Sequence, residues 1–193
     1  RHNRGAKIIG DVKSSQALFD YIEQLNGIPI MAKTGHSNIK TLILEINAAL
    51  AGEASSHIFF ADNYYGYDDA IYAAIRLLGF LETQEKPLHA LYDALPKYYN
   101  TPEIRIPCLE EEKFGIVESI RADLEKQGAN FINIDGVRVK TEAGWWLIRA
   151  SNTQSILVAR CEAYTESQLP NLISHMKMFL EPYTSLNFET LPE

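Results

Sequence analysis

Hydrophobic residues in the first half of the chain alternate between short continuous runs and stripes at helical spacing. The runs, at 6–10, 28–32 and 57–60, have the length of buried strands. The stripes predict helices over 18–25, 39–50, 71–78 and 88–95. Because strand and helix alternate, this half is predicted to be a three-layer α/β/α unit with a largely parallel sheet.

The second half has a different order of elements. Its strand-like segments are 103–106, 131–134, 137–140, 145–149 and 156–161. A helical stripe over 117–124 lies between the first two strands, and another over 169–180 follows the last strand. Asp135-Gly136 predicts a hairpin with a two-residue turn, since glycine takes positive φ without strain. We therefore expect a small α+β domain with an antiparallel sheet and two helices on one of its faces.

Prolines gather between the two halves, at positions 96, 102 and 107. Proline-rich segments are typical of domain boundaries, because few contacts cross them. The sequence therefore predicts two domains, residues 1–100 and 101–193.

Composition narrows the possible partners. Hydrophobic residues make up 46% of the 193 residues, enough for packed cores, and the net charge of −7 weighs against nucleic acid as a partner. No apolar run reaches the roughly 20 residues that span a bilayer, so no membrane partner is expected. Cys108 and Cys161 form no CxxC motif and favour reduced thiols in the cytoplasm. The chain does not begin with methionine, and we expect it to be a fragment.

The first polar loop lies between a predicted strand and a predicted helix. It reads Lys33-Thr34-Gly35-His36-Ser37-Asn38. A glycine turn with an imidazole and hydroxyls at a helix N-terminus suits an anion or a sugar. The alternative is ordinary helix capping by the serine or the asparagine.

The second polar loop, 52–57, reads Gly-Glu-Ala-Ser-Ser-His. If it is extended, Glu53, Ser55 and His57 face one side, because residues two apart share a face of a strand. A carboxylate, a hydroxyl and an imidazole can together bind sugar hydroxyls and phosphate. The alternative is a glycine that ends the preceding helix, followed by a polar loop without a functional role.

The third polar loop, 149–153, reads Arg-Ala-Ser-Asn-Thr between two predicted strands. The planar fork of Arg149 matches phosphate oxygens, and Ser151, Asn152 and Thr153 add further donors. The alternative is an ordinary hairpin loop with an incidental arginine.

Together with Gly10-Asp11-Val12-Lys13, the three loops occur in the order found in the α-D-phosphohexomutase superfamily, and the chain most resembles its phosphomannomutase/phosphoglucomutase branch. The resemblance covers essentially the whole chain. It implies domains three and four of a four-domain isomerase that interconverts hexose 1-phosphate and hexose 6-phosphate through a phosphoserine and a bisphosphate intermediate.

The resemblance also implies roles for individual residues. Glu53 and Ser55 would bind hexose hydroxyls, while Lys13, His36 and His57 would support catalysis in the same cleft. The loop over 149–153 would hold the phosphate that is not being transferred, through Arg149, Ser151, Asn152 and Thr153. The family uses magnesium, but its metal loop and its phosphoserine loop belong to the first two domains, and neither motif occurs here. We therefore expect no metal ligand in this chain, no turnover by the chain alone, and the N-terminal domains and hexose phosphates as partners.

Two positions depart from the family pattern. Ser56 stands where the family usually has glycine, which restricts positive φ, and Ser155 stands where proline is common, which predicts a looser phosphate loop. Two other interpretations of the function remain open at this point. One is a non-catalytic carbohydrate- or anion-binding module, and the other is an interaction protein whose polar loops are only turns.

Overall fold

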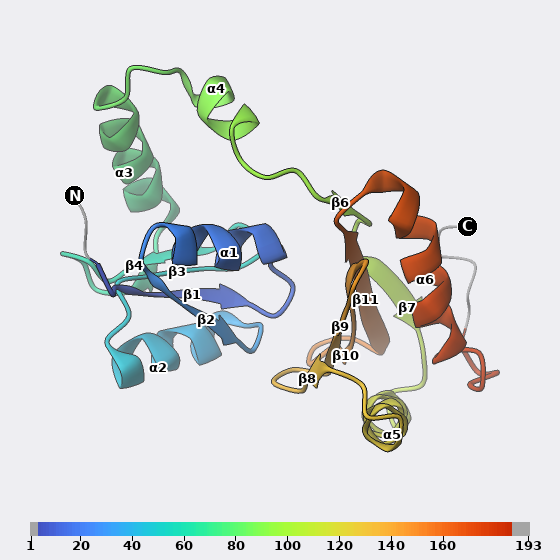
Figure 1. Cartoon of the computed structure of the whole chain (residues 1–193). Coiled ribbons are helices and arrows are strands. Elements are labelled where there is room, and N and C mark those ends of the chain that lie inside the picture. The colour runs from blue at the N-terminus through green and yellow to red at the C-terminus, as the bar shows by residue number, and fades with distance from the viewer. Residues whose placement is uncertain (1–3, 187–193) are drawn as a thin grey trace. The chain divides into compact units, whose positions relative to one another are not determined.

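The computed structural model describes residues 4–186 as two compact units that divide between Lys97 and Tyr98 (Figure 1). Each unit has its own sheet and its own buried core. Within residues 4–186, no helix is both long and apolar enough to cross a bilayer.

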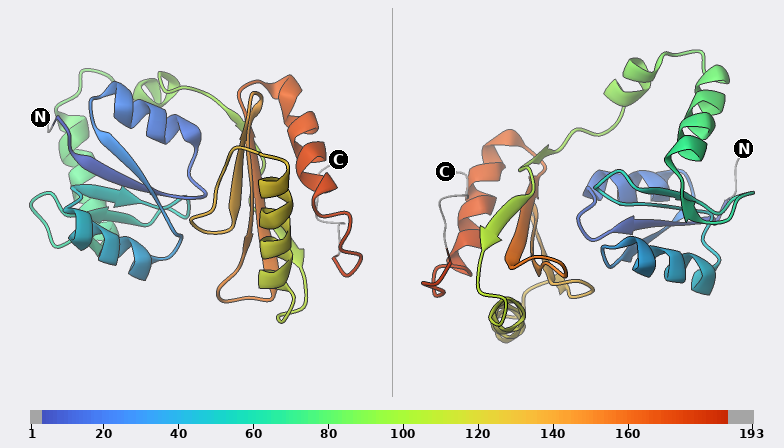
Figure 2. Two further views of the ribbon diagram at one scale, coloured as in Figure 1. Left: turned by 60° about the horizontal axis from the view of Figure 1, so that its bottom comes forward. Right: turned by 180° about the vertical axis from the view of Figure 1, so that it is seen from behind.

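The first unit is built on a five-stranded sheet in the order β2-β1-β3-β4-β5. Its elements are β1 (Lys7–Asp11), α1 (Gln16–Gln24), β2 (Ile28–Ala32), α2 (His36–Ile46), β3 (Leu50–Gly52), β4 (Ile58–Phe60), β5 (Tyr67–Asp68), α3 (Ala70–Glu82) and α4 (Leu88–Asp93). Strands β1, β2 and β3 are parallel, whereas β4 and β5 are added antiparallel. Helices α1 and α2 lie on opposite faces of this sheet (Figures 1 and 2), which confirms the predicted three-layer arrangement.

One face of the first sheet is closed by α2. Ile39 and Ile43 of this helix are buried against a cluster that includes Ile9, Ala51 and Phe59 from three neighbouring strands. The spacing of four residues places both isoleucines on one side of the helix, which is why the hydrophobic stripe predicts the element correctly.

The helix predicted over 39–50 is too long. Helix α2 ends at Ile46, and Asn47 takes the left-handed conformation with φ of 52°. Its N–H bonds to the carbonyl of Ile43 and closes the helix, a role that asparagine fills because it tolerates this conformation. Residues 50–52, which continue the hydrophobic stripe, form strand β3 instead.

The second unit has a fully antiparallel sheet in the order β6-β11-β10-β9-β8, and β7 also pairs with β11. Its elements are β6 (Tyr99–Asn100), β7 (Ile104–Pro107), α5 (Lys113–Lys126), β8 (Phe131–Ile132), β9 (Val137–Thr141), β10 (Gly144–Ala150), β11 (Ile156–Ala163), a short 3-10 turn η1 (Glu166–Gln168) and α6 (Leu169–Met178). Both α5 and α6 contribute to a single core with the strands, so both cover one face. The predicted α+β architecture with two helices is confirmed.

Adjacent tryptophans on β10 face opposite sides of the sheet, as neighbouring strand residues must. Trp146 belongs to the helix-side core and donates from Nε1 to Nδ1 of His175 at 3.0 Å. Trp145 donates to Glu162 at 2.8 Å and lies under the guanidinium of Arg138. Both indoles are buried with their N–H groups bonded, so they stabilise the sheet.

The predicted two-residue turn at Asp135-Gly136 is wrong. Ile132 pairs with Arg138, and residues 133–136 form a wider loop between β8 and β9. Gly136 is still required there, because its φ is 78° and a Cβ would clash with the carbonyl oxygen of Ile148. The close approach to β10 leaves Asp135 beside Arg149, a contact that the turn sequence alone does not reveal.

Candidate functional site

The polar loops of the first unit gather at one edge of its sheet. They follow β1, β2 and β3, three neighbouring parallel strands whose carboxyl ends lie at the same edge. Lys13 comes from the first loop, His36 from the second, and Glu53 with Ser55 from the third. The carboxyl edge of a parallel sheet is where α/β folds bind ligands. The topology thus brings together predicted residues that are up to 42 positions apart.

Asp11 joins all three loops. Its side chain is fully buried, and its carboxylate accepts from the Ser14 hydroxyl at 2.6 Å, the Thr34 hydroxyl at 3.3 Å and the Ala54 N–H at 3.1 Å. These donors come from three different loops. A buried carboxylate with several donors is a strong constraint, because each bond to the charged group is stronger than a neutral one. Asp11 therefore fixes the loops relative to one another.

Glu53 also connects two of these loops, through a hydrogen bond. Its Oε1 accepts from the N–H of Gly35 at 2.7 Å, and the residue is 9% exposed. Gly35 is the N-cap of α2 with φ of 117°, and no side chain of its own loop caps that helix. The capping role considered for Ser37 or Asn38 is thus wrong, since Asn38 instead donates to the carbonyl of Thr34. The carboxylate of Glu53 serves this helix end, where negative charge is favoured.

His57 is oriented by a neighbouring carboxylate. Its Nδ1 lies 2.6 Å from Oδ2 of Asp68, at the end of β5, and the imidazole remains half exposed. A histidine that donates a hydrogen bond from Nδ1–H to a carboxylate leaves its other ring nitrogen, Nε2, as an acceptor. The next residue, Asp69, is the N-cap of α3 and accepts from the N–H of Tyr72 at 2.9 Å, so two adjacent aspartates have separate tasks.

The loop after β3 is a tight turn and not an extended segment. Ser56 N–H bonds to the Glu53 carbonyl at 2.9 Å, and Glu53 N–H bonds to the His57 carbonyl at 3.0 Å. The expectation that residues 53, 55 and 57 share a face because they alternate along a strand therefore does not apply. Ser55 and His57 are exposed in this turn, whereas the side chain of Glu53 is held inward by Gly35.

Ser56 takes a positive φ of 71°, a conformation that costs a residue with a Cβ about 1–2 kcal/mol. Replacing Ser56 with glycine is expected to stabilise the first unit by about 0.5–1 kcal/mol after allowing for the greater chain entropy of glycine. Calorimetry should show a melting temperature higher by about 3 °C. Ser55→Gly is the matched control, since Ser55 has no positive φ and its replacement should lower the melting temperature. An equal response of both variants would contradict the turn geometry.

In the second unit, Arg149 is held by Asp135. Nε of Arg149 donates to Oδ2 at 2.9 Å and Nη2 to Oδ1 at 3.3 Å, while the two side chains are only 7% and 13% exposed. Two parallel bonds fix the plane of the guanidinium. The last residue of β10 before the loop is Ala150, so the arginine is anchored on a rigid strand.

The loop over 151–155 is folded around Ser151. Its hydroxyl oxygen accepts from the N–H groups of Thr153 at 3.3 Å and Gln154 at 3.2 Å. Ser151 is buried, whereas Asn152 and Thr153 are exposed at the tip. The serine thus shapes the turn, and a hydroxyl that accepts two bonds still has its own proton to donate.

Residues before and within α5 support this loop from outside. The buried Lys113 donates to the carbonyl of Gln154 at 3.1 Å and pairs with Glu110 at 2.6 Å. Ser155 donates to Glu110 at 2.9 Å, and hydrogen bonds from Lys113 and Ser155 lower the pKa of Glu110. The serine that replaces the usual proline therefore ties the loop to the start of α5, where a looser loop was expected.

Three functional partners escaped the sequence reasoning, namely Asp11, Asp68 and Asp135. Each holds a predicted loop or residue from another part of the chain, and none was given a role from the sequence, although Asp11 belongs to the motif at 10–13. Among residues 4–186, no three His, Cys, Asp or Glu side chains are grouped so that they could hold a metal ion.

Comparison with known proteins assigns both units. Residues 1–99 match the model of phosphoglucomutase/phosphomannomutase alpha/beta/alpha domain III, and residues 103–176 match the model of the C-terminal domain of the same family. The phosphomannomutase/phosphoglucomutase of Pseudomonas aeruginosa is 44% identical over 170 residues, which are 88% of this chain and 37% of that protein.

Two solved structures are similar to this chain. A phosphoglucomutase/phosphomannomutase family protein from Burkholderia thailandensis superposes with a TM-score of 0.85 at 37% identity, over 95% of this chain and 40% of that one. An N-acetylphosphoglucosamine mutase from Aspergillus fumigatus, solved with GlcNAc-6P and magnesium, has a TM-score of 0.60 at 13% identity, over 92% of this chain and 39% of that one; this likeness shows the fold alone.

The two units therefore match two domains of a family of sugar-phosphate mutases. The chain belongs to the phosphoglucomutase/phosphomannomutase family and comprises its domain III and C-terminal domain. It spans about 40% of the length of the relatives it matches.

Proposed function

We propose that this chain is the substrate-recognising half of a phosphohexomutase that interconverts the 1-phosphate and 6-phosphate of mannose, glucose or both. The observation that carries the proposal is the pair of preorganised polar loop systems, one in each unit, within a chain of this family. Residues 1–100 would form the sugar-binding domain and residues 101–193 the phosphate-binding domain. The phosphoserine of such an enzyme would lie outside this chain.

In the sugar-binding loops, Glu53 and Ser55 would bind hexose hydroxyls. The carboxylate of Glu53 is held by Gly35, and its position is fixed before a ligand arrives. Ser55 is exposed at the tip of its turn, where its hydroxyl can both donate and accept. His36 is exposed at the first position of α2 and would contact the ligand, while Lys13 follows β1 at the same sheet edge and would add positive charge beside the sugar.

His57 would move a proton at Nε2. Asp68 would accept a hydrogen bond from Nδ1–H and stabilise the imidazolium that forms when Nε2 takes a proton from a sugar hydroxyl. In the mutase reaction that hydroxyl, O1 or O6, attacks the phosphoryl group carried by the serine. The residue would then return the proton in the second half of the reaction, after the bisphosphate has turned round.

In the second unit, the phosphate that is not being transferred would be held at 149–153. Asp135 takes the Nε–Nη2 edge of Arg149, and a phosphate would use the opposite edge of the guanidinium. Ser151 would donate its hydroxyl proton while its oxygen keeps the turn folded, and Asn152 and Thr153 would add donors from the tip. This grip serves both orientations of the bisphosphate, because it reads only phosphate.

Magnesium, as found with the mutase from Aspergillus fumigatus, would neutralise the transferring phosphoryl group and be held outside this chain. We also propose a cytoplasmic enzyme, since Cys108 and Cys161 are both free thiols.

The test uses three ligands and amide NMR of the 193-residue chain. Inorganic phosphate should shift the amides of 151–154, methyl mannoside those of 53–57, and mannose 6-phosphate both groups. Turnover is expected only from the full-length gene product, assayed on mannose 1-phosphate and glucose 1-phosphate. Shifts without any full-length turnover would favour a non-catalytic binding module, and no shifts at 151–154 would contradict the phosphate grip.

A further inference from the structure

Helix α3 is apolar on every side and yet has no buried residue. Within the helix, Arg76 and the terminal Glu82 are the only charged residues. Its exposed large side chains are Ile71 (76%), Ile75 (59%), Leu77 (45%), Leu78 (66%) and Phe80 (51%). A helix that is hydrophobic all round is normally buried in a protein interior. An exposed apolar surface of this kind is typical of an interaction site.

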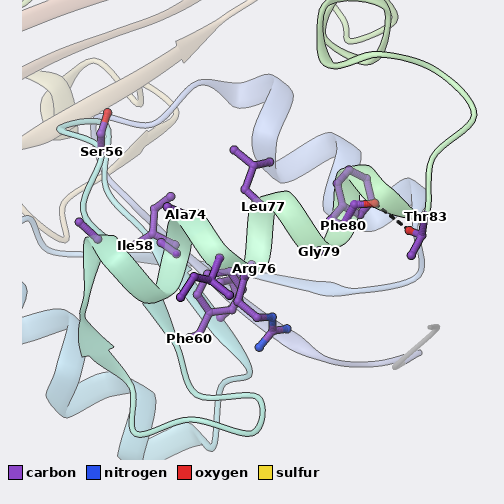
Figure 3. A pocket seen from close by; sticks show the side chains of 13 residues that line it. Ser56, Ile58, Phe60, Ala74, Arg76, Leu77, Gly79, Phe80 and Thr83 are labelled. Carbon is purple, nitrogen blue, oxygen red and sulfur yellow. Dashed lines mark hydrogen bonds between the residues drawn. The ribbon is translucent and has the colours of Figure 1, made fainter.

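The sheet beside α3 is only partly covered on the face toward this helix, where Leu50 and Phe60 are partly buried and Ile58 is 39% exposed. A hollow of about 1030 Å³ lies between this helix and β3 and β4, with Leu50, Ile58 and Phe60 as its floor (Figure 3). On the opposite face of the same strands, Ala51 and Phe59 are fully buried under α2. The face toward α3 is thus less completely covered than the face under α2.

The chemistry of the hollow favours a protein surface over a small polar ligand. Its polar side chains are Ser56, Arg76 and Thr83, at separate points of an otherwise apolar wall. Arg76 donates to the Asp62 carbonyl at 3.0 Å and packs 4.4 Å above the Phe60 ring. Thr83 donates to the Phe80 carbonyl at 2.7 Å. A sugar phosphate needs convergent donors, which these positions do not provide.

We propose that α3 and this hollow are the docking surface for the part of the same polypeptide that precedes domain III. This proposal rests on the proposed function, in which the parent protein has further domains. The chain spans only 37–40% of the relatives it matches, and its first unit matches a domain numbered III. A covalently connected partner is present at high effective concentration, so an apolar surface of this kind need not be exposed to solvent.

The proposed docking surface borders the loop at 52–57. Ser56 lies at one end of the hollow, and Asp69, the N-cap of α3, directly follows the Asp68 that orients His57. Covering α3 would restrain this segment and with it the His57–Asp68 pair. The docked segment therefore has a positioning role for the proposed proton transfer.

Thiol labelling tests the proposal. Ile71→Cys, Leu78→Cys and a control, Leu44→Cys, are each introduced into the 193-residue chain and into the full-length gene product. Leu44 lies on α2, is 79% exposed and is outside the hollow. The native thiols add little background, because burial raises the pKa of both and that of Cys161 to about 12. We expect the α3 cysteines to react with a maleimide at least 100-fold more slowly in the full-length protein, and the control equally fast in both.

Equal labelling of the α3 cysteines in both proteins would overturn the docking surface. The α3 cysteines could instead be protected from the maleimide in the 193-residue chain, to a degree that grows with protein concentration. That result would also overturn the proposal, because it would show that a second copy of this chain covers α3. Mutase activity of the unmodified full-length protein is measured separately. An active enzyme with a reactive α3 contradicts only this inference, whereas a protected α3 in an inactive protein contradicts only the proposed function.

Discussion

Arg149→Ala is expected to weaken phosphate binding by about 10- to 100-fold, because a hydrogen bond to a charged group contributes about 1.5–3 kcal/mol. The same change should destabilise the second unit by about 3 kcal/mol, since it removes one partner of a nearly buried ion pair. Both tryptophans lie on β10 of this unit, so urea unfolding followed by tryptophan fluorescence reports its stability. Phosphate affinity is measured by NMR titration of the folded variant.

A double-mutant cycle separates the two effects of Arg149. Removing Asp135 as well should restore part of the lost stability, because no carboxylate then remains buried opposite the missing guanidinium. Phosphate binding should stay weak in Arg149→Ala/Asp135→Ala. Arg121→Ala is the matched control, as this arginine pairs with Glu118 and Glu125 on α5 and should leave phosphate binding unchanged. If the double variant bound phosphate as tightly as the original protein, Arg149 would not be the phosphate ligand.

Asp11→Ala is expected to destabilise the first unit by about 3 kcal/mol. Three donors, Ser14, Thr34 and Ala54, lose a fully buried acceptor, and each donor left without one costs about 1–3 kcal/mol, partly recovered where water enters. Hydrogen exchange of peptides from β1 and β3 should show the loss. The loops should also lose their common anchor, so the shifts produced by methyl mannoside at 53–57 should disappear even where the unit stays folded.

Two further variants of this cluster sharpen the test. Asp11→Asn keeps the shape and one carbonyl oxygen, and its cost should fall between zero and that of Asp11→Ala. Asp93→Ala is the surface control, because Asp93 is 62% exposed and pairs only loosely with Lys97 at 3.4 Å. If Asp11→Ala unfolded no more readily than Asp93→Ala, the bonds to Asp11 would not organise the site.

The local pattern of hydrophobic and polar residues predicted most helices and strands correctly. It failed where a contact with a distant part of the chain determines the structure. The helix stripe over 39–50 runs on into β3, because buried strands and buried helix faces use the same apolar residues. Only Asn47, in its left-handed conformation, separates the two. Similarly, Asp135-Gly136 has the composition of a two-residue turn, but the pairing of Ile132 with Arg138 sets a longer loop.

The loops at the candidate site were likewise predicted only in part. Their residue types made 33–38, 52–57 and 149–153 recognisable as polar clusters and carried the family resemblance. The alternation argument for 53, 55 and 57 was wrong, because the N–H of Ser56 bonds back to Glu53 and closes a turn. Residue type indicates which chemistry a loop can offer, whereas backbone conformation decides where each side chain points.

The sequence by itself determined the order of most strands and helices, the two-part architecture and the positions of the three polar loops, because hydrophobic periodicity and turn chemistry are local properties. Only the tertiary structure decided that Asp11 ties three loops together, that Asp68 orients His57 and that Asp135 fixes Arg149. Apart from the bond between Asp11 and Ser14, those contacts join residues 11 to 43 positions apart. Their geometry depends on strand order and packing, which no short segment of the chain specifies.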